Sequence, residues 1–303
     1  MKKIEAHLEC VRCHRQYDLT KVRYNCDCGG ILDLVRDLSQ LDGAELKMLW
    51  DSRWGEKRGA TSSGVWRYKE LIFDLPDDEI VTRQEGNTRL YNAGKAGEYA
   101  GLKHFLLKHE GENPTGSFKD RGMTCGTTAA KFYGAGTVAC ASTGNTSASM
   151  ASYAAVSGLR SVIFIPEGKI AYGKLAQALA FGGKTLQIKG NFDDAMALVQ
   201  EVCRELNIYL LNSINPFRIE GQKAIGFEVL QQLDWQVPDW FVIPGGNLGN
   251  NTALSKGMKE LYDLGIIDKI PRIAVIQAAG SAPHYKMWKN HTPYEAVKNP
   301  ETI

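Results

Sequence analysis

The sequence GENPTGSFKDR, residues 111–121, places a single lysine, Lys119, directly after a turn. The run before it, 102–108, is apolar enough for a strand, and 123–132, rich in Ala, Thr and Gly, predicts a helix. The proline of the motif fixes one φ angle and its second glycine permits unusual backbone angles, as turns require. We therefore expect Lys119 at a strand-to-helix corner, where α/β proteins present side chains to a cleft.

Two interpretations of Lys119 follow from this position. A lysine amine there can form a Schiff base, and pyridoxal phosphate is the cofactor that most often requires one. The alternative is a solvated surface lysine beside the charged residues Asp120 and Arg121. A motif of this kind is a hypothesis until its structural context is known.

A loop of small hydroxyl residues, STGNTSAS at 142–149, follows a strand-like run at 137–141 and precedes a helical run at 150–156. A helix that opens on such a loop points several backbone N–H groups at one spot, where the helix dipole favours an anion. A substrate carboxylate would suit that spot. The alternative is an ordinary N-cap, which also prefers Ser and Thr.

The segment FVIPGGNLGN, 241–250, runs from an apolar strand into a loop dense in glycine, and 252–262 predicts the helix that follows. Glycines let backbone amides approach a phosphate closely, and the helix end adds its partial charge. The loop is neither a Walker A sequence nor a Gly-x-Gly-x-x-Gly fingerprint. It indicates a phosphate site or, alternatively, a tight turn.

In this order, a Schiff-base lysine, a carboxylate loop and a phosphate loop resemble the pyridoxal-phosphate enzymes of the tryptophan synthase β fold, and within that group the threonine synthases. The sharpest segment is NSINPFRIEGQK, 212–223, which is similar to the threonine synthase segment that holds the substrate's phosphate. The chain departs from the family pattern at Arg89, where proline is usual, and at Ala224, where threonine is usual. The resemblance runs from about Glu85 to the end of the chain and also covers EGNT at 85–88 and residues 113–121, 142–147 and 244–250.

The resemblance implies a role for each motif. Lys119 would hold the cofactor and move protons, and Asn145 would bond the phenolic oxygen of its ring. The cofactor's phosphate would be held by Gly245, Gly246, Asn247, Leu248, Gly249 and Asn250. The substrate, O-phospho-L-homoserine, would be bound at its carboxylate by Ser142, Thr143 and Thr146, and at its phosphate by Asn212, Ser213 and Arg218. The implied reaction releases phosphate, adds water and yields L-threonine.

The implied fold is α/β, with the two-domain architecture of fold type II pyridoxal-phosphate enzymes and an N-terminal zinc-ribbon-like segment. Strand-like runs alternate with helical segments, which predicts parallel sheets with right-handed crossovers. These runs lie near Phe105, Val138, Val162, Leu186, Tyr209, Phe241 and Ile273. Residues 37–68 are interpreted as a polar connecting region with a helical stretch at 41–50. The expected domains are the ribbon, 1–36; a large domain, 37–119 and 216–303; and a small domain, 120–215.

In the family, the large domain continues beyond the point that matches Ile303, and the continuation carries the hydroxyl residue that bonds the pyridine nitrogen. The resemblance therefore predicts a truncated threonine synthase. Two alternatives remain open at this point. One is another amino-acid lyase or synthase of the same fold, threonine dehydratase-like or cysteate synthase-like. The other is an inactive cofactor-binding remnant.

Four of the seven cysteines form two close pairs, Cys10-x-x-Cys13 and Cys26-x-Cys28. In a reducing compartment such pairs predict a tetrahedral structural zinc ribbon, because four thiolates leave no open position on the metal. The second pair is one residue tighter than usual, so the alternative is a relic ribbon without metal. The remaining cysteines are isolated among small or apolar residues and are expected in the core: Cys125, Cys140 and Cys203.

Composition agrees with a soluble metabolic enzyme, and the family resemblance implies that it acts on a small molecule. The 303 residues are long enough for two domains, and 36 Lys and Arg against 34 Asp and Glu leave a net charge of +2. That charge is too near neutral to indicate binding to nucleic acid or to a membrane surface. No apolar run is long enough to span a bilayer, and the start, MKKIEAH, lacks the apolar stretch of a signal peptide. We therefore expect a cytoplasmic protein, and a homodimer is left open.

Overall fold

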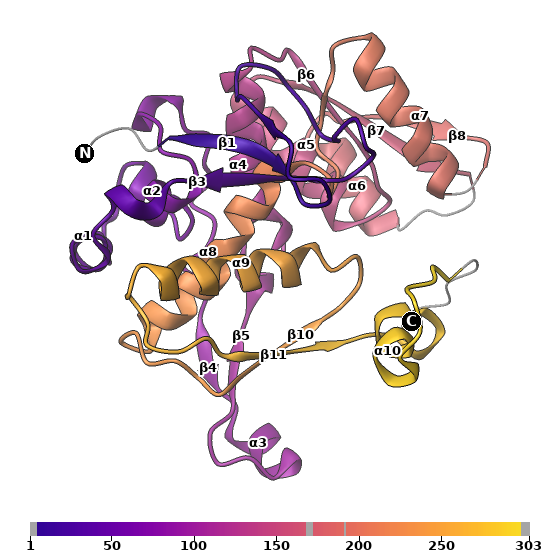
Figure 1. Ribbon diagram of the computed structural model, residues 1–303. Coiled ribbons are helices and arrows are strands. Elements are labelled where there is room, and N and C mark those ends of the chain that lie inside the picture. The colour runs from indigo at the N-terminus through magenta and orange to yellow at the C-terminus, as the bar shows by residue number, and fades with distance from the viewer. Residues whose placement is uncertain (1–4, 168–171, 191, 298–303) are drawn as a thin grey trace.

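The structure is α/β, with strands and helices alternating along most of the chain (Figure 1). It is a computed structural model that describes residues 5–167, 172–190 and 192–297. Two parallel sheets lie in different halves of the molecule, and a long central helix, α8 (Pro216–Gln232), runs between them. Within the described residues, no helix has both the length and the apolar character needed to cross a membrane.

The larger sheet has four parallel strands in the order β8-β7-β6-β9. Alternate residues of β6 face opposite ways: Val138 and Cys140 join the main core, whereas Ala139 and Ala141 pack with α7. Helices thus cover both faces, as parallel sheets require, and the predicted parallel arrangement of this region is confirmed. Its elements are β6 (Thr137–Ala141), α5 (Asn145–Ser157), β7 (Arg160–Pro166), α6 (Tyr172–Ala180), β8 (Lys184–Ile188), α7 (Phe192–Glu205) and β9 (Tyr209–Leu210).

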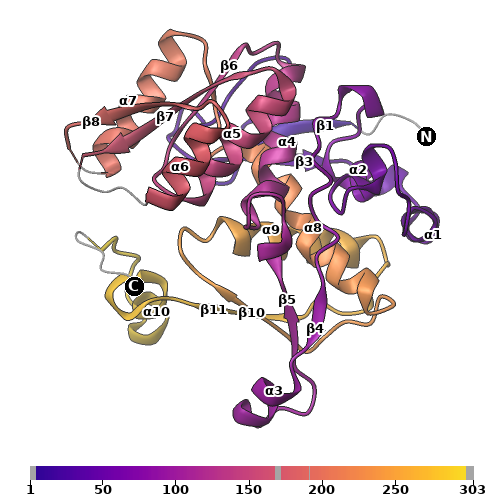
Figure 2. The same cartoon turned by 180° about the vertical axis from the view of Figure 1, so that it is seen from behind.

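The smaller sheet pairs β10 (Trp240–Pro244) with β11 (Arg272–Ile276) in parallel. They are connected by α9 (Gly249–Asp263), which packs against α8. The chain then continues to α10 (Pro283–Asn290), which lies apart from the sheet in both views (Figures 1 and 2). Three large apolar side chains of this sheet are exposed: Trp240, Val242 and Ile276.

A short hairpin departs from the prediction of parallel pairing. The strand expected near Phe105 is β5 (Leu106–Lys108), and it pairs antiparallel with β4 (Leu90–Asn92). The connection holds α3 (Gly94–Ala100), which projects from the body of the molecule (Figure 2). Antiparallel strands need only a short connection. The partner strand has only 3 residues and is too short to stand out in the sequence.

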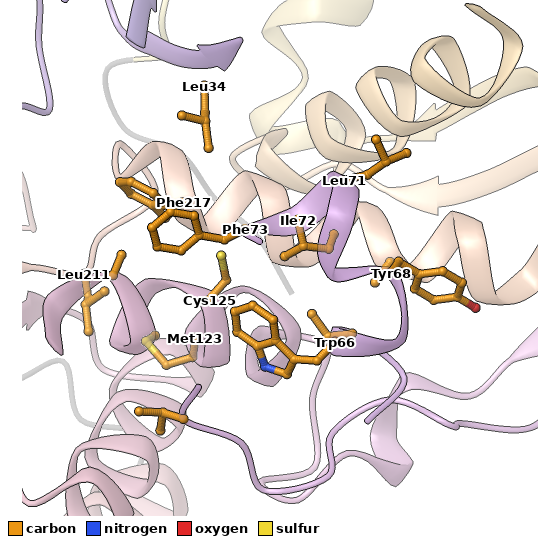
Figure 3. Close-up of a cluster of buried hydrophobic side chains, with 14 of the residues drawn as sticks. Leu34, Trp66, Tyr68, Leu71, Ile72, Phe73, Met123, Cys125, Leu211 and Phe217 are labelled. Carbon is orange, nitrogen blue, oxygen red and sulfur yellow. The ribbon is translucent and has the colours of Figure 1, made fainter. Parts of the chain in front are cut away.

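Residues 6–36 form a three-stranded antiparallel sheet of order β2-β1-β3, called here the ribbon. The ribbon contacts α8 through β3. In Figure 3, Leu34 of β3 belongs to the same apolar cluster as Phe73 and Phe217. The ribbon is therefore packed onto the body of the protein. Its strands are β1 (Ala6–Cys10), β2 (Gln16–Tyr17) and β3 (Leu32–Arg36).

Residues 37–68, predicted as a polar connection, instead contribute to the core. Trp50 of α1 (Gly43–Ser52) is fully buried, and so are Trp66 and Tyr68, which belong to the cluster in Figure 3. The rings of Trp50 and Tyr68 meet edge to face, with centroids 5.2 Å apart. Short helices break the apolar periodicity here, so the average composition is polar although individual side chains turn inward.

The central helix α8 contacts α4 (Lys119–Phe132), α9, α2 (Lys69–Ile72) and β3. Gly221 allows α8 to approach α4 closely, because a Cβ there would lie 2.0 Å from the carbonyl oxygen of Arg121. Packing on several sides leaves α8 little freedom to move, because protein interiors are packed as densely as organic crystals. Any side chain on α8 is therefore held in a well-defined place.

Candidate active site

Lys119 is the first residue of α4 and directly follows the turn at 113–118. The Gly116 N–H donates to the Asn113 carbonyl at 2.8 Å, and Gly116 has a φ of 77°, a conformation that favours glycine. The expected turn-to-helix corner is present. Asp120 and Arg121 are both fully buried. The alternative of a solvated charged surface is therefore wrong for these two neighbours of Lys119.

The Lys119 side chain is half-buried, and its Nζ lies 4.2 Å from the centroid of the Phe118 ring. Among the described residues, this Nζ has no hydrogen-bond acceptor and no carboxylate partner. Burial, with a smaller effect from the positive charge of Arg218, lowers the pKa of Lys119 to about 7. A neutral amine is therefore available near neutral pH, as a Schiff-base lysine requires.

The hydroxyl loop (142–146) connects β6 to α5. The Ser142 N–H donates to a carbonyl of β7 at 3.1 Å, and the Ser142 hydroxyl accepts a backbone N–H of the loop at 3.2 Å. The side chains of Thr143, Asn145 and Thr146 make no hydrogen bond with any residue that the structure describes, so they stay available for a ligand. A small recess beside them is lined by Ser142, Thr143, Ser147, Ile165 and Leu175.

The glycine loop (245–250) connects β10 to α9. Packing requires Gly245, because a Cβ there would lie 2.3 Å from a valine of β11, and Leu248 adopts a left-handed conformation with a φ of 63°. In the described part of the chain, the N–H groups of Gly246, Asn247 and Leu248 have no acceptor. Free N–H groups ahead of a helix of 15 residues suit a phosphate, since the helix N-terminus carries partial positive charge.

The segment 212–218 leads from β9 into α8. Asn212 holds the end of β6, because its Oδ1 accepts from the Ala141 N–H at 2.9 Å and its Nδ2 donates to the Ala141 carbonyl at 3.0 Å. Asn215, which sequence reasoning missed, caps α8 by accepting a backbone N–H of the first turn at 3.0 Å. Ser213 is exposed and makes no hydrogen bond with described residues, so the structure does not fix it in the site.

Arg218, in the first turn of α8, is 2% exposed. Its Nη1 donates to the Leu211 carbonyl at 3.0 Å, whereas its buried Nε has no partner in the ranges described. Those ranges also contain no carboxylate within ion-pair distance of Arg218. Burial lowers the pKa of Arg218 to about 10, which leaves the side chain charged at neutral pH. A buried cation without a counter-charge is costly and indicates a place for an anion.

One hydrogen bond and one electrostatic effect connect the start of α4, where Lys119 lies, to the other predicted site segments. The Ser149 hydroxyl of α5 donates to Asp120 at 2.5 Å, which joins the helix after the hydroxyl loop to the start of α4. The charge of Arg218 acts directly on Lys119, since it contributes to the lowered pKa of the amine. The lysine, the hydroxyl loop and the buried arginine therefore belong to one region of the molecule.

The glycine loop meets the same region through α8. An added Cβ at Gly249 would lie 3.7 Å from the Ile219 side chain, next to Arg218 in the sequence. No direct hydrogen bond joins the glycine loop to Lys119 in the described residues. The two are connected by the helix between them.

Sequence reasoning missed a cluster of buried charge beneath the site. Arg121 binds Glu110 at 2.7 Å and Glu228 at 2.9 Å. Glu228 also binds Lys108 at 2.5 Å and accepts the Thr88 N–H at 3.0 Å. The EGNT motif at 85–88 is thus anchored to α4 and α8 through carboxylates. The sequence offered no signal for these partners, because they lie far apart along the chain.

A second cluster includes Glu220 and Lys223, inside the segment that resembles a phosphate site. Both are fully buried and lie 2.7 Å apart. Glu220 also binds Lys256 of α9 at 2.6 Å and Arg36 of the ribbon. These two residues therefore join α8 to its neighbours. Opposite charges three residues apart on a helix were an available signal for such a pair.

The four paired cysteines meet at one end of the ribbon. Their Sγ atoms all lie within 4.8 Å of one another: Cys10, Cys13, Cys26 and Cys28. Two of the Sγ–Sγ distances are 3.5 Å, near the roughly 3.8 Å edge that follows from Zn–S bonds of about 2.3 Å. Hydrogen bonding from Tyr17, whose hydroxyl lies 3.1 Å from the Cys26 sulfur, lowers the pKa of Cys26 to about 6. The geometry is compatible with tetrahedral zinc. The isolated cysteines are free and buried, as predicted: Cys125, Cys140 and Cys203.

Residues 81–303 match the family described as pyridoxal-phosphate dependent enzyme. The chain belongs to this family. It is 48% identical over 298 residues to the threonine synthase of Methanocaldococcus jannaschii, an alignment that covers 97% of this chain and 71% of that protein. It is 50% identical over 300 residues to the threonine synthase of Methanosarcina acetivorans, covering 98% of this chain and 71% of that protein. The predicted resemblance to threonine synthases is confirmed.

Two solved structures of other enzymes share the fold. Maize serine racemase has a TM-score of 0.62 at 22% identity, covering 72% of this chain and 64% of that one. The processed form of threonine deaminase isoform 2 from Solanum lycopersicum has a TM-score of 0.63 at 21% identity, covering 82% of this chain and 64% of that one. The chain thus spans less than two thirds of the length of these two proteins. The likeness confirms the predicted α/β fold of type II and bears on the fold alone.

The residues of this site fit the family's cofactor, pyridoxal phosphate. Lys119 offers an amine with a lowered pKa and no competing partner among the described residues. The glycine loop offers backbone N–H groups that lack acceptors in the described chain and suit the cofactor's phosphate. Pyridoxal phosphate is therefore the cofactor of this chain.

Proposed function

We propose that this chain carries the active site of a threonine synthase, which converts O-phospho-L-homoserine and water into L-threonine and phosphate. Relatives that bear this name are 48% and 50% identical over nearly the whole chain. Net, the Cγ–O bond breaks, and the phosphate leaves with the bonding electron pair. Cβ loses a proton and gains the hydroxyl of water, Cγ gains a proton, and the remaining proton of water goes to the released phosphate.

The observation that carries the proposal is the unpaired charge of Arg218. Its side chain is 2% exposed, and it has one backbone carbonyl as its partner among the described residues. A substrate phosphate would supply the missing counter-charge through a two-pronged, charge-assisted contact. A lyase or synthase that acts on an unphosphorylated amino acid would have no use for this buried guanidinium. The phosphorylated substrate is therefore favoured over the dehydratase-like alternative.

The remaining roles are those that the family resemblance implies for these residues. Lys119, as a neutral amine, attaches the cofactor and moves protons at the substrate carbons. Bound pyridoxal phosphate supplies the electron sink that makes those carbons acidic. Asn145 bonds the cofactor ring oxygen, and the glycine loop holds the cofactor's phosphate. The substrate's carboxylate is bound by Ser142, Thr143 and Thr146, and its phosphate by Asn212, Ser213 and Arg218.

The proposal extends to the organisation of the chain. The N-terminal segment, 1–36, which contains the ribbon, is structural, and in it Cys10, Cys13, Cys26 and Cys28 bind zinc. Residues 37–119 and 216–303 form part of a large domain, and 120–215 form a small domain. The protein acts on its small-molecule substrate in the cytoplasm.

Replacing Arg218 tests the proposed substrate. Arg218→Ala is expected to lower kcat/KM for O-phospho-L-homoserine. The loss of transition-state stabilisation should be about 2–5 kcal/mol, as is usual when one partner of a buried charge pair is removed. Activity on serine or threonine should change far less. The control is Arg160→Ala, which removes an exposed arginine from β7. Both variants should keep the visible absorbance band of the bound cofactor.

Equal losses on phosphorylated and unphosphorylated substrates would contradict the proposal, since Arg218 would then support the fold and not the phosphate. An unchanged kcat/KM for O-phospho-L-homoserine would contradict it as well. Arg218→Lys sharpens the test. Lysine keeps the charge but loses the two-pronged geometry, so its activity should lie between those of the wild type and the alanine variant.

A further inference from the structure

We propose that Tyr24, in the ribbon, is a positioning residue for the anion site at Arg218. The inference rests on the proposed function, in which Arg218 binds the substrate's phosphate. Tyr24 does not touch that site. It acts through β9, which leads directly into the segment 212–218.

Tyr24 supplies a hydrogen-bond partner that β9 otherwise lacks. This strand lies at the edge of the larger sheet and pairs with β6 on one side only. The Leu210 N–H points away from β6 and donates to the Tyr24 hydroxyl at 2.7 Å. The Tyr24 ring also meets the Tyr209 ring edge to face, with centroids 5.7 Å apart. The Tyr24 side chain thus accepts the free N–H at the edge of β9 and also packs against this edge.

The backbone that Tyr24 holds is the same backbone that holds Arg218. Leu210 is 1% exposed, and its carbonyl accepts from the Asn215 side chain at 2.8 Å. The next carbonyl, that of Leu211, accepts from Arg218 Nη1 at 3.0 Å. The position of the guanidinium therefore depends on two consecutive residues of β9 and its extension. Tyr24 fixes the first of them.

A second attachment of the ribbon, in addition to that at β9, is to α8, the helix that carries Arg218. Arg36 of β3 forms an ion pair with Glu220, two residues after Arg218 on α8, and both side chains are buried. Arg36 also donates to the Ile72 carbonyl. Lys256 of α9 binds Glu220 at 2.6 Å and Asp33 of β3 at 2.6 Å. The ribbon therefore holds α8 beside the site as well as the strand before it.

Loss of the Tyr24 hydroxyl would leave the Leu210 N–H buried without an acceptor. A buried unpaired N–H is unfavourable, so the edge of β9 would shift toward another acceptor or toward water. Such a shift moves the Leu211 carbonyl and with it Arg218. No hydrogen bond joins Lys119 or the glycine loop to β9 in the described residues, so both should keep their places. The expected defect is thus in anion binding and not in cofactor binding.

The test is Tyr24→Phe in the full chain loaded with pyridoxal phosphate, with inorganic phosphate as the probe. Phosphate affinity, measured by calorimetry, should fall about fivefold, which corresponds to one lost hydrogen bond. KM for O-phospho-L-homoserine should rise by a similar factor while kcat and the cofactor absorbance band stay unchanged. Amide hydrogen exchange should accelerate at Leu210 and Leu211.

The matched control is Tyr133→Phe. Tyr133 stacks on the same Tyr209 ring, with centroids 5.9 Å apart, but its buried hydroxyl has no hydrogen-bond partner in the described chain. Its loss should leave phosphate affinity unchanged. Arg36→Lys tests the second attachment independently. It keeps the charge facing Glu220 but loses the bond to Ile72, and a loss of about twofold is expected.

The outcomes separate the inference from the proposed function. If Arg218→Ala leaves phosphate affinity unchanged, the proposed function is wrong and the positioning role of Tyr24 falls with it. If Arg218→Ala abolishes phosphate binding while Tyr24→Phe and Arg36→Lys behave like the wild type, the proposed function stands and the positioning role is overturned. A loss of cofactor absorbance in Tyr24→Phe would also overturn it, because the effect would then reach beyond the anion site.

Discussion

Arg121 and Arg218 are two buried arginines at the interface of α4 and α8, and they differ in their partners. Arg121 binds Glu110 and Glu228 and also donates to the Gly64 carbonyl at 3.2 Å. Arg218 has one backbone carbonyl and a free Nε among the described residues. The charge of Arg121 stabilises the fold and is neutralised by carboxylates of the protein itself. A charge without a counter-ion, as at Arg218, fits the proposed role of binding an anionic ligand.

The largest expected effect comes from exchanging each arginine for methionine. Arg121→Met leaves the buried Glu228 with only one of its two cations, Lys108, and should lower the free energy of unfolding by about 3–5 kcal/mol. Arg218→Met removes an uncompensated buried charge, so its stability should be unchanged or higher. Urea unfolding of both variants without phosphate gives the comparison. Similar losses in the two would show that Arg218 also serves the fold.

A second prediction concerns the pKa of Lys119, which burial and the charge of Arg218 lower to about 7. The amine is mostly protonated below this pH and mostly neutral above it. The rate at which pyridoxal phosphate attaches to the apoprotein should therefore rise about tenfold between pH 6 and pH 8 and then level off. Attachment is followed by absorbance and by borohydride reduction of the lysine adduct.

The same experiment on Arg218→Met tests the link between the two residues. Without the neighbouring positive charge, the pKa of Lys119 should rise, so the midpoint of the rate profile should move to higher pH. Lys174→Ala is the control, because it removes another cation near Lys119: the Lys174 Nζ donates to the Thr115 carbonyl at 3.1 Å, in the turn that precedes Lys119. The midpoint should not move in this variant. A midpoint that is identical in wild type and Arg218→Met would show that the charge of Arg218 does not reach Lys119.

A smaller effect than in the two preceding predictions is expected from Gly126→Ala on α4. The added Cβ would lie 2.7 Å from the Leu211 side chain and 3.2 Å from Cγ of Arg218, so Arg218 must move slightly. Phosphate affinity should fall about threefold, a few tenths of a kcal/mol per displaced contact. Gly136→Ala is the control, because a Cβ there meets no atom within 4 Å. Tighter phosphate binding in Gly126→Ala would contradict the proposed packing around Arg218.

Local patterns were enough to predict the parts of the site that lie at the ends of elements. Lys119 begins α4, the hydroxyl loop precedes α5 and the glycine loop precedes α9, because turns and helix starts depend on nearby residues. The cysteine pairs were equally visible, since their spacing is local. Family resemblance added the roles of these residues, which local patterns do not contain.

Contacts between distant segments were not predictable in this way. The antiparallel partner of β5 is too short to show a pattern. The burial of Trp66 and Tyr68 depends on helices that come later in the chain. The same holds for Arg121, whose partner Glu228 is 107 residues away. A charged residue has the same appearance in a sequence whether it is solvated, paired or left for a ligand, and only packing distinguishes the three.

The ribbon's two attachments join residues that are made at very different times. Tyr24 and Leu210 are 186 residues apart, and Arg36 and Glu220 are 184 apart. On a ribosome that adds about 5–20 residues per second, the ribbon waits on the order of ten seconds for its docking surface. A segment this short buries too little apolar surface to stay folded alone. Zinc bound at the cysteine cluster would therefore stabilise the ribbon most in the nascent chain, before α8 exists.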